Sequence, residues 1–525
     1  MLAPRRFWVA GTKEYLAVGE DLIQSQCIIV YSYRLLLHPL RSYPGPFLAK
    51  ISDWYGAYNA YRRRIPTITY RDHLTYGPVV RHGPNKLVFN SIQAMRDILQ
   101  NERLFKSSAY LVTQASPTTF NLFNVMDKHL HRTRRRMIGQ GLTEGAVHRF
   151  EPVFQDHIVV FLQHHLEASL QDHAVDMSQR CGWLTMDVSG ELGFGRGFGL
   201  QTDPSSRYVS MMNRRINVYL QFPAIKHTGW EKLLLLILLP KVRRFHRFLS
   251  GLIQSRVSQD KNARPDLFSS VSEYKDPETG KGLTRTEIWS EAAFLIPAGG
   301  DTVASLLSGV FFYLSRYPRV YERLAAEIRA TFVGAEDIKH GPKLSGCNYL
   351  RGCLDESLRI SPPTGTTLWR DLPLDANANP VIVDGHVIPP GTSLGVNIYA
   401  VHHNEAYFAS PFDYKPERWL PDESGLTDEQ TATMHSAFMA FSKGSRNCAG
   451  TAFAYTEASL VVAKTLWYFD FEKYGEDAAS AESGRPAVFH MDDQVGSSHA
   501  GPMLVFRRRG DAWKVLESQH GPGGL

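Results

Sequence analysis

The amino-acid sequence predicts a mainly α-helical fold with a small β region. Between about residues 125 and 360, apolar residues recur at the 3.6-residue spacing of amphipathic helices. From about residue 369 to 396, short apolar runs alternate with Pro and Gly, as in small strands joined by turns. No linker rich in Ser, Gly or Pro divides the middle of the 525-residue chain, so we expect one large domain over residues 44–525, after an N-terminal segment of residues 1–43.

The longest expected helix is weakened at its centre. It begins at the capping box Thr284–Glu287 and stops before Pro318, which gives roughly 34 residues and a length of about 50 Å. Its middle, residues 297–302, is poor helix material, because Pro costs about 3 kcal/mol and each Gly about 1 kcal/mol relative to Ala. We expect this weak place to serve function, with a simple packing kink as the alternative. Another long helix is expected after Cys448, ending near Leu466.

Composition and charge exclude several classes of protein. The formal net charge is only +6, and the basic clusters lack the aromatic interleaving of a nucleic-acid binder, so no nucleic-acid partner is expected. The five cysteines include no CxxC pair, which argues against a disulfide framework and a structural zinc site. The glycines between residues 193 and 199 do not spell GxGxxG, so we expect neither a bound nicotinamide nor a bound flavin.

Two apolar segments indicate contact with a membrane surface. Residues 22–40 are apolar but are interrupted by Gln, Arg and His, so they fall short of the ~18 uninterrupted apolar residues of a spanning helix. We expect them to form an interfacial, partly inserted helix. The run Trp230–Pro240 is dense in Leu and is followed by Lys and Arg, a pattern that fits a membrane surface and a buried helix equally well.

The strongest chemical signal is the segment Phe441-Ser-Lys-Gly444-Ser-Arg446-Asn-Cys448-Ala-Gly450. A thiolate that ligates a metal needs a rigid loop around its sulfur, and Gly444 and Gly450 permit a tight turn and a close approach. Arg446 is suited to a carboxylate, because a guanidinium binds one with two hydrogen bonds. Phe441 would shield the sulfur of Cys448 from water.

This segment resembles the haem-binding signature of the cytochromes P450, Phe-x-x-Gly-x-Arg-x-Cys-x-Gly, at every defined position. The resemblance implies the cytochrome P450 fold, with haem b (iron protoporphyrin IX with an axial thiolate) between the long central I helix and the L helix. Cys448 is then the iron ligand. The resemblance covers residues 44 to 509, and the motifs at 38–40, 44–46 and 399–404 are similar to those of fungal secondary-metabolism members.

A charge network is implied by a second motif. Glu356 and Arg359, three residues apart on one helix face, resemble the Glu-x-x-Arg of the family's K helix. Arg418 resembles the third member of the same network. We expect the three to be buried together and to support the haem pocket, since a buried pair broken on one side is strongly destabilising.

The weak centre of the long helix is similar to the family's oxygen-binding motif. We expect the helix to widen at Gly299 and Gly300, which would leave a groove for dioxygen and water. The resemblance implies that Thr302 hydrogen-bonds to the carbonyl of Ala298 or donates at the iron, and that Asp301 relays protons from solvent.

Several cations resemble the family's partners of the haem propionates. His131 and Arg135 resemble a motif of the C helix, with His131 where Trp is more usual, and Arg370 stands where the family places another partner beside Arg446. An ordinary surface position is the alternative for each arginine.

The resemblance implies insertion of one oxygen atom from O2 into an apolar small molecule, with electrons from an NADPH–cytochrome P450 reductase. Lys443, Arg132 and Arg134 are candidates for docking that acidic partner. The family resemblance and the N-terminal segment together imply a peripheral or weakly anchored protein on the cytoplasmic face of the endoplasmic reticulum membrane.

Substrate contacts are expected from residues 120–125, 294–298, 364–368 and 496–501. Two alternatives remain: a haem-thiolate enzyme that performs oxidative coupling or rearrangement without oxygen insertion, and a non-catalytic haem-binding protein. The intact Asp301–Thr302 pair argues against an isomerase or a dehydratase and leaves oxidative coupling open.

Overall fold

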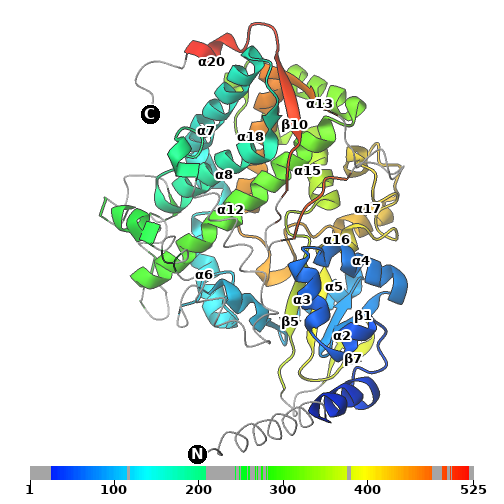
Figure 1. Ribbon diagram of the computed structural model, residues 1–525. Helices are drawn as coiled ribbons and strands as arrows, with labels where there is room; N and C mark the ends of the chain where they lie inside the picture. The colour runs from blue at the N-terminus through cyan, green and yellow to red at the C-terminus, as the bar shows by residue number, and fades with distance from the viewer. Residues whose placement is uncertain are drawn as a thin grey trace, which may run out of the picture.

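The computed structural model describes residues 25–114, 119–207, 282–374, 380–475, 488–493 and 499–518, with Ser497 and short pieces between residues 240 and 280. Most of the helices gather in one part of the molecule, and the larger sheet lies with the N-terminal helices at the other end (Figure 1). The apolar run expected at a membrane surface, Trp230–Pro240, falls outside the described residues except for Pro240.

The expected mainly α fold with a small β region is confirmed. The longer helices are α4 (Ile65–Tyr76), α6 (Lys128–Gln140), α7 (Glu144–Leu170), α8 (Met177–Phe194), α12 (Arg285–Leu314), α13 (Pro318–Thr331), α15 (Asn348–Ile360) and α18 (Thr451–Tyr468). The shorter ones are α2 (Phe47–Ile51), α3 (Trp54–Tyr61), α5 (Ile92–Leu99), α14 (Pro342–Ser345), α16 (Ile398–His402), α17 (Asp428–Ala437) and α20 (Lys514–Ser518).

The strands form three small sheets. The largest has the order β1-β2-β8-β5-β3, in which β2 and β8 are parallel and the other neighbours antiparallel. Its strands are β1 (Val79–Gly83), β2 (Lys86–Phe89), β3 (Phe105–Lys106), β5 (Thr367–Asp371) and β8 (Ser393–Asn397). The second sheet joins β4 (Val175–Asp176), β10 (Met503–Arg508) and β9 (Phe469–Lys473), and the third pairs β6 (Val381–Val383) with β7 (His386–Ile388).

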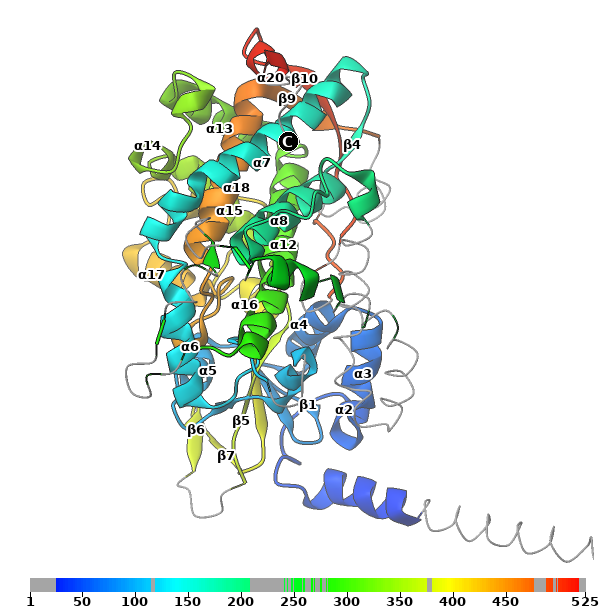
Figure 2. The same ribbon diagram turned by 90° about the vertical axis from the view of Figure 1, so that its left-hand side faces the viewer.

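The long helix α12 runs through the helical part of the molecule and packs on α8 and α18 (Figures 1 and 2). Its buried apolar residues from Val303 onward belong to the main apolar core, to which α7, α8, α13, α15 and α18 also contribute, and Ala292 and Ile296 belong to a smaller cluster with α8. Among the described residues it is the one helix with the length and hydropathy of a membrane span, and 61% of its most apolar window is buried within the protein. α12 is therefore a core helix.

Both ends of α12 agree with the sequence. The Thr284 side chain accepts from the N–H of Glu287 and the Glu287 carboxylate accepts from the N–H of Thr284, which completes the expected capping box. The helix ends at Leu314, and Pro318 is the first residue of α13. Proline is tolerated there because its missing N–H would have no partner in the first turn.

The structure gives Gly299 and Gly300 a role other than the predicted widening. The helix is continuous across both residues, with Pro297 inside it. A Cβ on Gly299 would lie 2.6 Å from the Ser189 hydroxyl, and one on Gly300 would lie 2.9 Å from Cγ of Met186, both on α8. The two glycines therefore allow α8 to approach α12 closely.

Candidate functional site

A tight loop holds Cys448 just before α18. The N–H of Cys448 donates to the carbonyl of Phe441 (2.8 Å), which closes the loop across seven residues. The ring of Phe441 packs on Tyr455 of α18, with the ring centroids 5.0 Å apart. Both contacts fix the loop relative to the helix that follows it.

The two glycines of this loop differ in backbone conformation and in the space around the Cβ position. Gly444 has φ +77°, and a Cβ there would lie 2.5 Å from the carbonyl oxygen of Leu99, so only glycine fits. Gly450 has φ −91°, and nothing lies within 4 Å of its Cβ position. The protein alone does not demand glycine at 450, and the requirement there would come from whatever binds beside Cys448.

Cys448 differs from the deeper cysteines of the chain. Cys181, Cys347 and Cys353 are buried, whereas Cys448 is solvent-accessible. The protein that surrounds the thiol still desolvates it and raises its pKa, while the N–H of Gly450, the Thr451 hydroxyl and the Arg135 guanidinium act in the opposite direction. The donors near its sulfur are therefore those that would stabilise a thiolate.

Arg135 braces the cysteine loop. Its guanidinium donates to the carbonyl of Asn447 (2.6 Å), to the side-chain oxygen of Asn447 (2.9 Å) and to the carbonyl of Cys448 (3.4 Å). In this arrangement Arg135 of α6 positions the residue before the cysteine, and its charge also helps to lower the pKa of His131 on the same helix.

The central part of α12 presents Ala298, Asp301 and Thr302. The Thr302 hydroxyl donates to the carbonyl of Ala298 at 2.6 Å, one of the two geometries that the sequence implied. Asp301 is half-buried. The hydroxyl of Ser305, one turn further along, donates to the backbone carbonyls of Asp301 (2.8 Å) and Ser497 (3.2 Å), which ties a C-terminal loop to this part of the helix.

The structure brings Glu356, Arg359 and Arg418 together in the interior. Arg359 binds the Glu356 carboxylate with two hydrogen bonds (2.8 and 2.9 Å), and Arg418 adds a third (3.0 Å). The indole of Trp419 and the backbone N–H of Lys415 donate to the same carboxylate (2.9 and 3.0 Å). Although burial opposes ionisation, the two guanidinium groups hold the pKa of Glu356 below its usual value.

His402 extends this network to the cysteine loop, and the sequence reading did not single it out. Its Nδ1 donates to the carbonyl of Arg359 (3.0 Å), and its Nε2 accepts from the N–H of Met439 (2.9 Å). Burial lowers the pKa of His402 to about 3, so the ring is neutral and serves as donor and acceptor at once. A buried histidine in a short helix carries no sequence signal that separates this role from ordinary packing.

A second missed residue, Lys106, lies beside a predicted one. Lys106 of β3 and Arg370 of β5 are direct partners across two antiparallel strands, and both side chains are buried. Like charges placed opposite each other destabilise a sheet. Burial, Arg370 and Arg446 all lower the pKa of Lys106 well below its usual value. A lysine in a short strand looks ordinary in sequence, so the pairing could not be foreseen.

Arg446 and His131 complete this cation cluster, which we define as Lys106, His131, Arg370 and Arg446. The guanidinium of Arg446 donates only to the backbone carbonyls of Val125 (2.5 Å) and Met126 (3.2 Å) in the described part of the chain. Burial together with Arg446 and Lys106 lowers the pKa of His131 to about 3. Within the described residues, none of the three cationic members, Lys106, Arg370 and Arg446, forms an ion pair with an acidic side chain, so the cluster fits an anionic group.

Aromatic rings adjoin the cluster on the side of α12. The Phe123 ring is stacked on Phe294 of α12 (4.7 Å, 16° between planes) and meets Tyr110 edge-on (5.3 Å). The Lys106 ammonium lies 3.9 Å from the centre of the Phe123 ring and 4.4 Å from that of Tyr110. Two of the predicted substrate segments, 120–125 and 294–298, therefore meet at this aromatic cluster.

The other predicted substrate segments approach the same helix. The N–H and hydroxyl of Ser497 both donate to the carbonyl of Pro363 (2.8 Å each), directly before the predicted segment 364–368. Of the segment 496–501, residues 496 and 498 lie outside the described residues. A thiol loop, a cation cluster and loops that converge on one helix fit a site for an anionic cofactor.

Comparison with known proteins identifies the family. The cytochrome P450 family profile matches residues 62–491. The cytochrome P450 monooxygenase fscF of Fusarium equiseti is 34% identical over 511 residues, which cover 92% of this chain and 94% of that protein. The cytochrome P450 monooxygenases apf7 of Gibberella fujikuroi (32% over 517 residues; 93% and 97%) and poxM of Penicillium oxalicum (34% over 488 residues; 91% and 91%) are similar.

Fold and site thus define a haem-thiolate oxidoreductase. The chain belongs to the cytochrome P450 family and is a monooxygenase, which uses O2 and a small-molecule substrate. The residues present fit the family's cofactor: Cys448 is accessible for the iron, and the cation cluster would hold the two propionates.

Glu356 is expected to be essential for stability. Glu356→Gln keeps the size of the side chain but leaves Arg359 and Arg418 buried without a counter-charge, so we expect a loss of about 3–5 kcal/mol in the free energy of unfolding. Urea unfolding followed by tryptophan fluorescence measures it. Glu423→Gln is the control, since this carboxylate pairs with Arg323 at the surface, where solvent screens the pair, and its loss should change the free energy of unfolding far less. Equal losses in both variants would contradict the role assigned to Glu356.

Lys106 is expected to help retain the cofactor. Lys106→Met keeps an unbranched side chain of similar length and removes the charge, so we expect haem to be lost roughly tenfold faster, as for removal of one charge-assisted hydrogen bond. Transfer of haem to apomyoglobin measures the rate. Lys514→Met, at an exposed pair with Asp511, is the control and should behave as wild type. An unchanged rate in Lys106→Met would exclude Lys106 from the propionate site.

Proposed function

We propose that Cys448 ligates the iron of haem b and that the enzyme inserts one oxygen atom from O2 into an apolar small molecule of fungal secondary metabolism. The observation that carries this proposal is the accessible cysteine in a rigid loop, combined with a buried cation cluster that has no acidic partner among the described residues. When bound, the haem iron supplies dioxygen binding and O–O bond cleavage, which electron donation from a thiolate favours. The similarity of the chain to fungal cytochrome P450 monooxygenases supports the assignment to fungal secondary metabolism.

The protein supplies protons and exclusion of water. Thr302 is the proposed donor at the distal side, because its hydroxyl is held by Ala298 and can turn from that carbonyl toward a ligand. Asp301 is proposed to pass protons to it from solvent. The aromatic rings of Phe123 and Phe294 would keep the site apolar, which favours an apolar substrate over a charged one.

Electrons are proposed to come from an NADPH–cytochrome P450 reductase that docks near the cysteine loop. Arg132 is exposed on α6, and Lys443 is half-buried in the loop, so both remain candidates for an acidic partner. Arg134 does not. Its side chain is 2% exposed and is paired with Glu287 and Glu291, which corrects the sequence-based assignment of Arg134 to a docking surface.

The endoplasmic reticulum membrane is proposed as the location, with the N-terminal end of the protein on its cytoplasmic face. The helical residues 25–37 project from the end of the molecule that carries α2 and α3 (Figure 2). Large apolar side chains are exposed on these elements: Ile28, Ile29, Leu36, Leu37, Phe47, Leu48, Trp54, Tyr58 and Tyr61. Trp54, Tyr58 and Tyr61 are spaced i, i+4, i+7 and share one face of α3, and aromatic rings of this kind suit a membrane interface.

The reduced carbon monoxide difference spectrum tests the ligation by Cys448. We expect the strongly red-shifted band of a thiolate-ligated carbonyl complex in the wild type and its loss in Cys448→Ser. Cys353→Ser is the control, because that thiol is fully buried in the main core of the protein. A haem complex that lacks the shifted band in the wild type, or that keeps it in Cys448→Ser, would mean another axial ligand.

The membrane proposal is tested by flotation with vesicles of phosphatidylcholine and phosphatidylserine. Trp54→Glu combined with Tyr58→Glu should lower the bound fraction at least about threefold, because two carboxylates replace the aromatic face of α3. Val333→Glu is the control: Val333 is also exposed, but it follows α13 at the other end of the molecule (Figure 1). Equal flotation of both variants and the wild type would exclude this face as the contact.

A further inference from the structure

The loop of residues 119–126 is fastened at both ends. At its C-terminal end, Arg446 of the cysteine loop donates to the carbonyls of Val125 and Met126. Inside the loop, Asn121 and Asn124 exchange hydrogen bonds: Asn124 Oδ1 accepts from the N–H of Asn121 (2.9 Å), and Asn121 Oδ1 accepts from the N–H of Asn124 (3.0 Å). Its N-terminal half depends on a different element.

That half is held by a carboxylate on the first turns of α12. The N–H of Leu122 donates to Oε2 of Glu291 (2.9 Å), while Arg134 of α6 donates to Oε1 of Glu291 (2.7 Å). Arg134 also donates to Glu287, one turn earlier (2.6 Å). Glu291 thus joins α12, α6 and the loop in one place, and Glu287 joins only the two helices.

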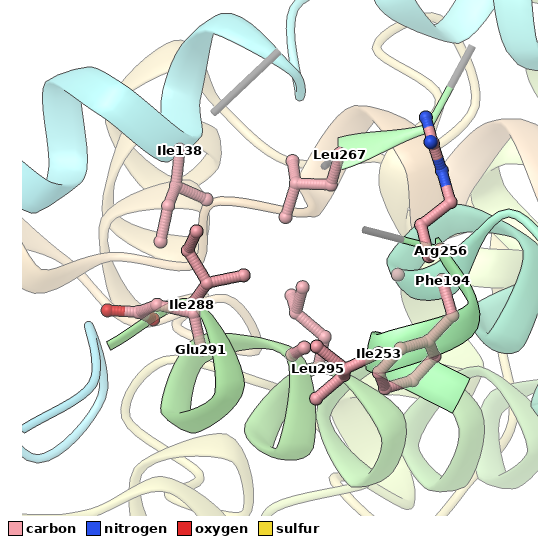
Figure 3. Close-up of a pocket in the computed structure, with 10 residues that line it drawn as sticks. Ile138, Phe194, Ile253, Arg256, Leu267, Ile288, Glu291 and Leu295 are labelled. Carbon is pink, nitrogen blue, oxygen red and sulfur yellow. The ribbon is translucent and has the colours of Figure 1, made fainter. Parts of the chain in front are cut away.

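The surroundings make the Glu291 contacts strong. Glu291 is 5% exposed and Arg134 2% exposed, so water does not compete for either group. On one side Glu291 borders a small, partly open hollow whose lining is mostly apolar, including Ile138, Phe194 and Leu295. The carboxylate points away from the centre of this hollow (Figure 3), toward its two donors. Burial raises the pKa of Glu291, and Leu122 N–H and Arg134 oppose that effect.

The residue after Leu122 is Phe123, whose ring is stacked on Phe294 of α12. Phe294 precedes Ala298 by one helical turn, so the Phe123 ring stands next to the part of α12 where the monooxygenase reaction is proposed to occur. The backbone contact at Leu122 therefore determines how the ring of its neighbour is placed.

We propose that Glu291 is a positioning residue for substrate selection: it holds the Leu122–Phe123 segment against α12 and so fixes the Phe123 ring as a wall of the substrate site. The inference rests on the proposed function, because it assumes that the haem lies below these rings. We call the hydrogen bond between the N–H of Leu122 and the Glu291 carboxylate the clamp. The clamp does not touch the substrate. The Phe123 ring does, and Glu291 acts through that ring.

The test compares two azoles that coordinate haem iron in the intact holoenzyme. Imidazole is small enough to report on the haem alone, and 4-phenylimidazole adds a ring that must fit beside Phe123. In Glu291→Gln the one remaining oxygen stays with the charged Arg134 guanidinium, which is the stronger donor, and the amide NH2 faces the N–H of Leu122, so the contact to the loop is lost. We expect the Kd of 4-phenylimidazole to rise at least about fivefold, which corresponds to about 1 kcal/mol. The Kd of imidazole should stay within about twofold of the wild-type value.

Glu287→Gln is the matched control. Gln still completes the capping box of α12, and the substitution removes a carboxylate from Arg134 without touching the loop. Both azoles should bind this variant as they bind the wild type. A selective effect of equal size in Glu287→Gln would overturn the proposal, because the charge on Arg134 and not the clamp would then be responsible.

Phe123→Ala keeps the proposal testable if Glu291→Gln loads haem poorly. It should weaken 4-phenylimidazole selectively, and Glu291→Gln added to it should weaken the ligand no further, because the clamp would have no ring left to position. No selective effect in Phe123→Ala, or parallel weakening of both azoles in Glu291→Gln, would overturn the proposal. A wild-type protein without a haem spectrum would overturn the proposed function together with it, and that result precedes any comparison of variants.

Discussion

The rest of the site depends on one buried carboxylate, that of Glu356. Five hydrogen bonds converge on it, two from Arg359 of α15 and three from residues 415–419. Arg359 also donates to the carbonyls of His402 and Pro411. The Nε2 of His402 in turn accepts from the N–H of Met439, which precedes the cysteine loop. A charge in the interior is stable only when its partners are fixed, so each of these segments is confined by the same requirement. The loop that presents Cys448 inherits its rigidity from this network.

The interior holds a second group of charges that is built in the opposite way. Around Glu356 each cation faces an anion, whereas Lys106 and Arg370 face each other across two strands. Such an arrangement lowers the stability of the protein by itself. The family's cofactor explains it, because two propionates would supply the missing negative charge. The cations that support the fold therefore share an anionic partner within the protein, and those proposed to hold the cofactor have none among the described residues.

Sequence reasoning succeeded where the cause is local. The capping box of α12, the short strands between about residues 369 and 396, and the start of α18 after Cys448 follow from residues a few positions apart. It failed where the cause is a partner far along the chain. Gly299 and Gly300 read as a weak point of a helix, but their reason is the surface of α8. Lys106 becomes significant only when β5 brings Arg370 beside it, and Arg134 loses its apparent surface role only when α12 supplies two carboxylates.

The same long helix explains how distant loops act on one small volume. Along α12, Glu291 holds the loop at Leu122, Thr302 binds back to Ala298, and Ser305 binds the backbone of Ser497. These residues follow one another at intervals of one or more turns, about 5.4 Å each, so their order along the helix becomes their order in space. Pro297 and the two glycines at the centre of this helix have low intrinsic helix propensity. Its helical conformation there is therefore stabilised mainly by packing on α8 and α18. Substitutions on α8 that loosen this packing would therefore move the loop contacts and the Thr302 region together, although no residue of the site itself had changed.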